Sequence, residues 1–204
     1  MARVLALRLG YLYLDTGALY RAVAWKVQQT GVEPGSAEAI AAMLGTTTIR
    51  IEQQPERTCV LVDGKDITKD LRSPEVSRLA SVVSAVPAVR EWLLPVQREI
   101  GRSGGLVAEG RDLGTRVFPG ADVKFFLDAS LEVRAARRTL ELTAAGRHAA
   151  LDQTSRDIEA RDGRDRTREL APLIPAPDAR IIDTSELQVE EIVDRMMDAI
   201  ALKL

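Results

Sequence analysis

Two short stretches of this chain mix arginines with carboxylates at spacings that could bind a charged ligand. The first is Glu109–Asp112, which reads Glu-Gly-Arg-Asp. The second is the segment 156–170, in which the candidate residues are Arg161, Arg164, Asp165 and Arg168. Guanidinium groups hold phosphate through paired hydrogen bonds, whereas a carboxylate accepts hydrogen bonds from an amine or a hydroxyl. The mixture therefore favours a ligand that combines phosphate with an amine or a sugar.

The first stretch lies between two apolar runs, Leu106–Ala108 and Val123–Leu127. Runs of this length, bounded by turn residues, are typical of buried strands in a mostly parallel sheet. Ligands bind beyond the carboxyl ends of such strands, and Arg111 and Asp112 stand at that place. The alternative is a surface loop that carries a local ion pair.

The second stretch has its four candidate residues at helical spacings, so one helix face would carry all of them. A charge run of this kind is also typical of a solvated helix face, and the pattern alone leaves both interpretations open. Gly163 in the middle of the run predicts a mobile hinge.

A third candidate site begins at Asp15-Thr16-Gly17, a turn that opens a predicted helix from Ala18 to Gln29. Asp15 or Thr16 could cap this helix through its side chain. The N-terminal amides of the helix, together with Arg21, could form an anion site. A capped helix with a surface arginine explains the pattern equally well.

The composition excludes several classes of protein. The net charge of −2 over 204 residues gives no global field for nucleic acid or an anionic membrane, and the few aromatic residues are not interleaved with a basic stripe. The single cysteine, Cys59, excludes an internal disulfide and a cysteine-rich zinc site, and its apolar neighbours predict burial. No segment reaches the roughly 20 apolar residues of a membrane span. We therefore expect a cytoplasmic protein with no nucleic-acid or membrane partner, and we expect a monomer.

Other patterns predict the elements around these sites. Met1–Leu9 has good helix formers before Gly10. Runs at 46–52 and 58–62, with a tight-turn signal at Asp63-Gly64, predict a hairpin that interrupts the strand–helix alternation and looks inserted.

Helix starts are predicted from capping residues further along the chain. Ser73 before Pro74 has this pattern, and Ser130 is expected to cap the helix that follows it. After a last strand at Ile181–Asp183, Ser185 and Gln188 predict a capping box for the final amphipathic helix.

The carboxylates narrow the ligand class by their chemistry. A carboxylate can accept a hydrogen bond from the exocyclic amine of cytosine, whereas the corresponding oxygen of uracil would face it repulsively. A cytosine nucleotide is thus a reasonable ligand for Asp112 or Asp165, although spacing alone does not select it.

Several segments together resemble the bacterial cytidylate kinase family. They are Tyr-Leu-Asp-Thr-Gly-Ala-Leu-Tyr-Arg (13–21), Asp-Gly-Lys-Asp-Ile-Thr (63–68), Leu-Arg-Ser-Pro-Glu-Val (71–76), Glu-Gly-Arg-Asp-Leu-Gly-Thr (109–115), Arg-Asp-Gly-Arg-Asp-Arg-Thr-Arg (161–168) and Ala-Pro-Leu-Ile-Pro-Ala-Pro-Asp-Ala (171–179). They occur in the family's order and cover essentially the whole chain. Each segment is moderately specific alone, and the set is strongly specific.

The resemblance implies a three-layer α/β fold of the P-loop kinase type, with a parallel sheet, an inserted acceptor-binding region and a short lid. The implied division is the start of the core at 1–30, the acceptor-binding region with its hairpin at 31–100, core at 101–145, lid at 146–170 and core at 171–204. The implied activity is transfer of the terminal phosphoryl group of ATP to CMP or dCMP with Mg²⁺, by a nucleoside monophosphate kinase.

The resemblance also implies roles for individual residues. The acceptor phosphate would be held by Arg21, Arg111 and Arg168, with Thr16 beside it. Cytosine would be read by Ser81, Arg90 and Asp112, and the sugar by Arg161 and Asp165. ATP would receive further positive charge from Arg137 and Arg164, and the catalytic arginines would be Arg161, Arg164 and Arg168.

The chain departs from the family pattern in one respect. The family begins with a strand and a phosphate loop of the form Gly-x-x-x-x-Gly-Lys-[Ser/Thr], and no such motif occurs in the 204 residues. Met1–Gly10 resembles the helix that normally follows this loop. A chain without the loop and its central strand is expected to bind ATP poorly, catalyse little and fold precariously.

Three explanations of this departure are open. The start of the chain could be assigned too far downstream or truncated, the chain could be a short CMP-binding module without activity, or a second polypeptide could supply the loop. Two other functions also remain open, namely a kinase for another monophosphate such as UMP and a structural or regulatory fragment.

Overall fold

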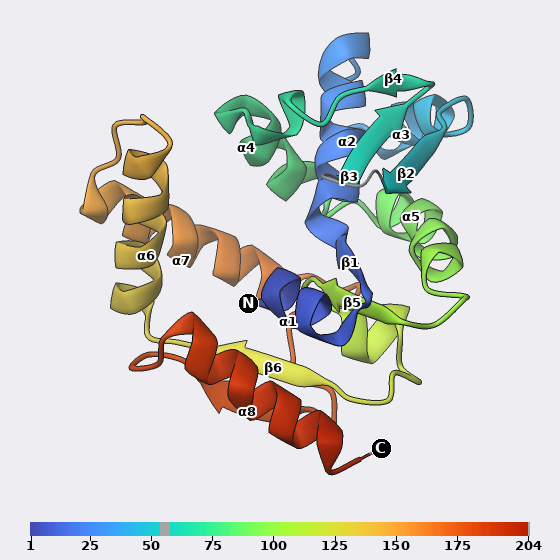
Figure 1. Ribbon diagram of the computed structural model, residues 1–204. Helices are drawn as coiled ribbons and strands as arrows, with labels where there is room; N and C mark the ends of the chain where they lie inside the picture. The colour runs from blue at the N-terminus through green and yellow to red at the C-terminus, as the bar shows by residue number, and fades with distance from the viewer. Residues whose placement is uncertain (54–57, 204) are drawn as a thin grey trace. The chain divides into compact units, whose positions relative to one another are not determined.

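The computed structural model describes residues 1–53 and 58–203, which fall into two compact units (Figure 1). We call Tyr13–Gly110 the central unit, and Met1–Leu12 with Arg111–Leu204 the terminal unit. Helices accompany short sheets, and strands β6 (Phe125–Asp128) and β7 (Arg180–Asp183) pair in parallel, which confirms the predicted α/β class.

The central unit contains helices α2 to α5 and the short strands β1 to β5. Its elements are β1 (Leu12–Asp15), α2 (Thr16–Thr30), α3 (Ala37–Leu44), β2 (Ile49–Gln53), β3 (Thr58–Val62), β4 (Lys65–Asp66), the 3₁₀ turn η1 (Asp70–Arg72), α4 (Pro74–Val83), α5 (Pro87–Ile100) and β5 (Leu106–Glu109). Strand β1 starts one residue before the unit and pairs with β5.

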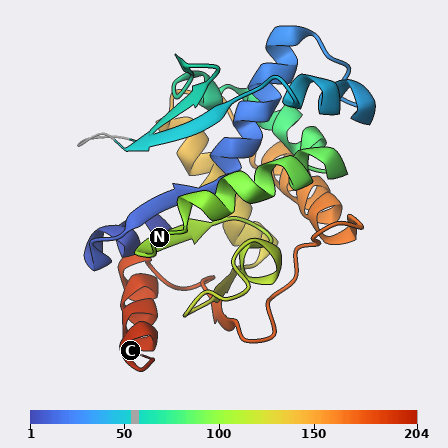
Figure 2. The same cartoon turned by 90° about the vertical axis from the view of Figure 1, so that its right-hand side faces the viewer.

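Helix α2 is at the centre of the hydrophobic core of this unit. Leu19, Val23 and Val27 recur at four-residue spacing and are each at most 1% exposed, so one face of the helix is fully buried. Helices α4 and α5 and strand β3 pack against α2, and Figure 2 shows the β2–β3 hairpin beside it. The packing of this face fixes the start of α2, and hence the residues around position 16, relative to the rest of the unit.

The predicted hairpin is present and is extended by a third strand. Strands β2 and β3 pair antiparallel from Ile49↔Val62 to Gln53↔Thr58, and β4 adds an antiparallel edge after the turn at Asp63-Gly64. The connection at 54–57 lies outside the described residues. Cys59 is buried on β3, as its apolar neighbours predict.

The terminal unit carries the C-terminal elements and the first helix. They are α1 (Ala2–Leu9), a single π-helical turn η2 (Leu113–Val117), β6 (Phe125–Asp128), α6 (Leu131–Ala144), α7 (Leu151–Thr167), β7 (Arg180–Asp183) and α8 (Val189–Ala201). Strands β6 and β7 run parallel in the register Phe125↔Arg180 to Asp128↔Asp183, as expected from their apolar runs. Helices α6 and α7 lie side by side (Figure 1), and α1 packs against α8.

Most predicted caps are confirmed. Gly10 ends α1 in the left-handed conformation. The hydroxyl oxygen of Ser73 accepts from the amide of Val76, and that of Ser130 accepts from the amide of Val133.

The predicted capping box of the final helix is wrong. The box is formed by Gln188 and Glu191, and the helix begins at Val189. The hydroxyl oxygen of Ser185 instead accepts from the amide of Ser130, and its own proton goes to Asp183. Ser185 therefore joins the ends of β6 and β7, a use that its local sequence does not reveal.

Helix α7 runs from Leu151 to Thr167 without a break at Gly163. The predicted hinge therefore does not interrupt the helix, and a single continuous helix carries most of the charged residues of this segment. Glycine lowers helix stability but does not end a helix that its neighbours continue.

No single helix within residues 1–53 and 58–203 is long and apolar enough to cross a membrane. Helices α4 and α5 meet such a test of length and composition only as a pair, and they are bent by 102° relative to each other.

Candidate functional site

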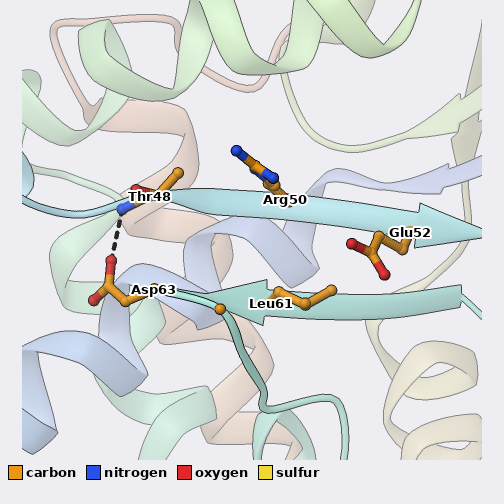
Figure 3. Close-up of a pocket in the computed structure, with 6 residues that line it drawn as sticks. Thr48, Arg50, Glu52, Leu61 and Asp63 are labelled. Atoms are coloured by element: carbon orange, nitrogen blue, oxygen red, sulfur yellow. Dashed lines mark hydrogen bonds between the residues drawn. The ribbon is translucent and has the colours of Figure 1, made fainter.

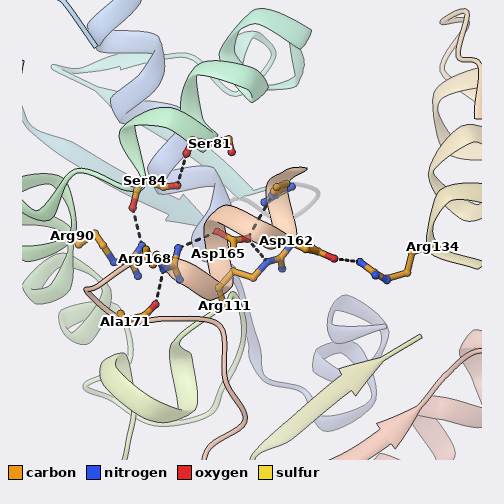
Figure 4. Close-up of polar contacts among 10 residues, drawn as sticks. Ser81, Ser84, Arg90, Arg111, Arg134, Asp162, Asp165, Arg168 and Ala171 are labelled. Atoms are coloured by element: carbon orange, nitrogen blue, oxygen red, sulfur yellow. Dashed lines mark hydrogen bonds and ion pairs between the residues drawn. The ribbon is translucent and has the colours of Figure 1, made fainter. Parts of the chain in front are cut away.

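Three arginines converge on the carboxylate of Asp165 in the terminal unit. Arg168 donates from Nη1 to Oδ1 at 3.1 Å, and Arg111 donates from Nε to Oδ2 at 3.1 Å (Figure 4). Nε of Arg161 lies 3.8 Å from the same Oδ2. Asp165 is buried, and a buried carboxylate is tolerated only with such partners. The structure thus brings together four of the predicted site residues, which we call the Asp165 cluster.

Helix α7 and its C-terminal end position this cluster. Arg161 precedes Asp165 by four residues and Arg168 follows it by three, so helical geometry places both beside it. Nε of Arg168 also donates to the carbonyl of Ala171 at 2.6 Å, and the amide of Leu173 donates to the carbonyl of Asp165 at 2.7 Å. The chain leaving the helix is therefore fastened back onto the cluster.

The cluster has more positive than negative charge. Three guanidinium groups meet one carboxylate, so these four side chains carry a formal charge of +2. The side chain of Arg168 is only 8% exposed, whereas those of Arg111 and Arg161 are 41% and 53% exposed. Arg111 and Arg161 can therefore donate hydrogen bonds to an anion that arrives from solvent, while Arg168 holds the Asp165 carboxylate in place.

Neighbouring arginines of the same unit are bound to other groups. Arg134 on α6 pairs with Asp162 on α7, which ties the two helices together. Arg137 donates to the hydroxyl oxygen of Thr184 at 3.1 Å, and to the carbonyls of Thr184 and Leu187 at 2.6 and 3.2 Å. These bonds give Arg137 a structural role, and its predicted contact with ATP stays a prediction.

Asp112 follows Arg111 at the end of β5 and is 5% exposed. Its carbonyl accepts from the amides of Arg116 and Val117, at 2.9 and 3.3 Å, and from the hydroxyl of Thr115 at 3.3 Å. These bonds start the π-helical turn and hold the backbone of Asp112 in one conformation. Asp112 is thus buried with its backbone held in place, and its role in reading the base stays a prediction.

The predicted base-reading residues of the central unit form a second group. Arg90 is 3% exposed, and it donates from Nη1 to the carbonyl of Ser84 at 3.0 Å (Figure 4). The hydroxyl of Ser84 in turn donates to the carbonyl of Ser81 at 3.1 Å. The guanidinium of Arg90 also lies over the ring of Tyr20, 5.3 Å from its centroid. Sequence reasoning assigned no role to Tyr20 or Ser84, because no local pattern links α2 to α5.

The start of α2 differs from its prediction in one respect. Asp15 occupies the capping position, but its side chain makes no capping hydrogen bond. Its Oδ2 accepts from Nη2 of Arg21 at 2.5 Å instead. The predicted side-chain cap is therefore wrong, because the guanidinium of Arg21 outcompetes the backbone amides for this carboxylate.

Two further contacts join β1 and the start of α2 to the end of β5. The hydroxyl of Thr16 donates to the carbonyl of Glu109 at 2.8 Å, and the hydroxyl of Tyr13 donates to Oε1 of Glu109 at 2.5 Å. Burial raises the pKa of the Tyr13 phenol far above its ordinary value, and the hydrogen bond and negative charge of Glu109 raise it further. Tyr13 is thus a neutral donor that fixes the Glu109 carboxylate.

The predicted site residues divide between the two units. Those of the central unit are Thr16, Arg21, Ser81 and Arg90. Those of the terminal unit are Arg111, Asp112, Arg137, Arg161, Arg164, Asp165 and Arg168. The structure forms contacts within each set, and the joint reading of cytosine by Ser81, Arg90 and Asp112 stays a prediction.

Two surface pockets do not contain these residues. A pocket of about 230 Å³ on the β2–β3 hairpin is lined by Thr48, Arg50, Glu52, Leu61, Asp63 and Gly64 (Figure 3). A pocket of about 380 Å³ in the terminal unit is lined by Phe125, Arg180, Ile181, Ile182, Asp183, Arg195 and Ala199. Both pockets contain arginine and carboxylate side chains, but neither is lined by a predicted site residue.

Metal ligands do not cluster in the part of the chain that the structure describes: no group of three or more His, Cys, Asp or Glu side chains there could hold an ion.

Comparisons with known proteins agree with the residue pattern. The family model described as cytidylate kinase matches residues 1–202. A cytidylate kinase of Desulfitobacterium hafniense (strain Y51) is 48% identical over 197 residues, which cover 97% of this chain and 84% of the relative. A cytidylate kinase of Symbiobacterium thermophilum is 42% identical over 198 residues, covering 97% of this chain and 88% of the relative.

A longer relative shows the same likeness over part of its length. The bifunctional pantoate ligase/cytidylate kinase of Synechococcus sp. (strain JA-3-3Ab) is 46% identical over 200 residues, which are 97% of this chain and 37% of that protein. The match of the family model to nearly all of the chain, with these identities, decides the assignment. The chain belongs to the cytidylate kinase family.

Proposed function

We propose that this nucleoside monophosphate kinase transfers the terminal phosphoryl group of ATP to CMP or dCMP, giving CDP or dCDP. The family and the names of its relatives support this reaction. The observation that carries the proposal is the Asp165 cluster, in which three arginines share one buried carboxylate. Three guanidinium groups held around one buried carboxylate leave net positive charge, which can bind a nucleotide phosphate.

The proposed roles of the remaining residues follow their chemistry. The acceptor phosphate is bound by Arg21, Arg111 and Arg168, with Thr16 beside it. Cytosine is read by Ser81, Arg90 and Asp112, and the sugar by Arg161 and Asp165. Charge on the transferred group is neutralised by Arg161, Arg164 and Arg168. Arg137 provides a further positive charge for ATP.

Phosphoryl transfer needs little covalent help from the protein. The reacting groups must be held in line, water must be excluded, and negative charge on the moving group must be neutralised. Arginines already fixed by hydrogen bonds meet the last need without reorganising during the reaction. Arg168, held by Asp165 and by the carbonyl of Ala171, is such a residue.

Mg²⁺ is proposed to accompany ATP. Mg²⁺ is commonly bound by one or two carboxylates together with substrate phosphates. When bound with ATP, the ion would supply further positive charge to the phosphates.

Turnover by the 204-residue chain is a separate proposal. These residues contain no Gly-x-x-x-x-Gly-Lys motif, which in P-loop kinases cradles the ATP phosphates. We propose that they bind CMP while catalysing transfer slowly. A coupled assay with ATP and CMP tests this, and sustained turnover by the 204 residues would contradict it.

Ligand binding tests the acceptor class. CMP and dCMP should raise the melting temperature of the chain more than UMP or AMP does. Arg111→Gln should weaken CMP binding at least about tenfold, because a charge-assisted contact to phosphate is lost. The matched control is Arg138→Gln, since Arg138 pairs on the surface with Glu141. If UMP or AMP stabilises the chain as strongly as CMP, the proposed acceptor is wrong.

Base discrimination tests Asp112 separately. Asp112→Asn should lower the preference for CMP over UMP, because an amide can also donate to the uracil oxygen. Titration of both nucleotides against the variant measures the ratio, and an unchanged ratio would count against Asp112 as the base reader.

A further inference from the structure

Arg21, which we propose binds the acceptor phosphate, is held in place within the central unit before any ligand arrives. Its Nη2 donates to Oδ2 of Asp15 at 2.5 Å, and the two side chains are 28% and 33% exposed. This bond uses one of the five N–H donors of the guanidinium.

The direction of the Arg21 side chain follows from helix geometry. Helical side chains lean toward the N-terminus, so a long residue covers the position four residues before it. For Arg21 that position is Gly17. The guanidinium extends over Gly17 and reaches Asp15, which precedes the first residue of α2.

Gly17 leaves room for this contact. A Cβ at position 17 would lie 2.9 Å from Oδ1 of Asp15 and 3.0 Å from Nη1 of Arg21, closer than carbon normally approaches either atom. Gly17 does not have a positive φ, so its backbone does not require glycine. Glycine also lowers helix stability relative to alanine. Glycine at this position leaves the ion pair undisturbed, whereas a Cβ would oblige the ends of both side chains to shift.

The carboxylate of Asp15 is committed to this pair rather than to the helix. An Asp at the capping position ordinarily accepts from the amides of the first turn, and Asp15 makes no such bond. The pair therefore keeps a guanidinium at the helix end whose dipole favours anions.

We propose that Asp15 is a positioning residue that holds Arg21 ready for the acceptor phosphate, and that Gly17 supplies the space for their contact. The inference rests on the proposed function, in which Arg21 binds that phosphate. A free arginine side chain would have to be ordered when the nucleotide binds, which weakens binding. Asp15 orders it in advance and leaves its other donors for the ligand.

The test measures CMP and cytidine binding to the 204-residue chain by calorimetry and by ligand competition. Asp15→Asn and Gly17→Ala should each weaken CMP binding about three- to tenfold, the effect of leaving one flexible side chain to be ordered by the ligand. Binding of cytidine, which has no phosphate, should not change. Gly17→Ala should not lower the melting temperature, because alanine favours the helix.

Two matched controls separate positioning from a general effect. Lys26 lies on the same helix α2 and donates to Asp63 at 2.8 Å, with similar exposures of 22% and 36%. Asp63→Asn should leave CMP binding unchanged. Gly35 has nothing within 4 Å of a Cβ, so Gly35→Ala should also leave it unchanged.

The variant Arg21→Gln separates the phosphate-binding role of Arg21 from the positioning role of Asp15. It should weaken CMP binding strongly, and Asp15→Asn should add no further loss in that background. If Arg21→Gln leaves CMP binding unchanged, the phosphate role of Arg21 fails and the inference fails with it. If Arg21→Gln weakens binding but Asp15→Asn leaves it unchanged or tightens it, the positioning role alone is overturned. An equal loss of cytidine binding would overturn it as well.

Discussion

Arg168 and Asp165 form an ion pair in which both side chains are more than nine-tenths buried, with Nη1 of the arginine 3.1 Å from Oδ1 of the aspartate. Burial makes this pair different from the other ion pairs around it. A buried charge that loses its partner cannot be solvated by water, so the two residues depend on each other.

Asp165→Ala should lower the free energy of unfolding by about 3–5 kcal/mol, because it leaves the guanidinium of Arg168 buried without its carboxylate. Urea denaturation measures the change. Glu141→Ala is the control, since Glu141 pairs with Arg138 on the surface, and it should cost at most about 0.5 kcal/mol. Similar losses in the two variants would mean that the buried pair contributes no more than a surface pair.

Arg137→Ala should lower the free energy of unfolding by about 1–3 kcal/mol, because hydrogen bonds to Thr184 and to the carbonyl of Leu187 are lost together. Arg138→Ala removes a neighbouring arginine with an exposed partner and serves as the comparison. Thermal unfolding without nucleotide reports the effect. If Arg137→Ala changes only ATP binding, the structural role assigned to Arg137 is wrong.

Tyr13→Phe should lower stability near neutral pH by about 1.5–3 kcal/mol, the usual contribution of a hydrogen bond to a charged group. The raised pKa of Tyr13 has a second consequence. The neutral phenol is favoured in the folded state, so its contribution is present below the ordinary phenol pKa and is lost as pH rises through the raised value. In an alkaline absorbance titration, one of the three tyrosines should therefore ionise late. The late phase should vanish in Tyr13→Phe, and its persistence there would assign it to another tyrosine.

Asp63→Asn should destabilise the chain at neutral pH but not in acid. The hydrogen bonds from Lys26 and from the amide of Thr48 lower the pKa of Asp63 below its ordinary value. A carboxyl with a lowered pKa stabilises the fold above its unfolded pKa, and this contribution is lost as pH falls through the folded value. Melting temperatures of both proteins across acid pH should converge at the lowest values. A constant difference at all pH values would exclude the charge of Asp63 as the cause.

Local features of the chain could be predicted from its sequence. Ser73 and Ser130 cap helices as expected, because a cap needs only residues three positions apart. The convergence of Arg161 and Arg168 on Asp165 also follows from helical spacing. Family membership was equally accessible, since the matching motifs lie in order along the chain and the family model covers residues 1–202.

Where several groups compete for one partner, the sequence alone did not determine the outcome. Asp15 has the pattern of a helix cap, but its carboxylate accepts a hydrogen bond from the guanidinium of Arg21 instead. Ser185 has the pattern of a capping box, but Gln188 and Glu191 form it. In each case two acceptable hydrogen-bond partners lie within reach, and a difference in geometry or charge decides between them.

Contacts between distant segments were decided only by the tertiary structure. Arg111 reaches Asp165 across 54 residues, and Arg90 lies over the ring of Tyr20 from a different helix. Tyr13 likewise donates to Glu109 from the neighbouring strand. Residue types and helical spacing determined which side chains could take part. Which of them meet depends on how buried faces pack, because packing sets the distances between segments that no local spacing encodes.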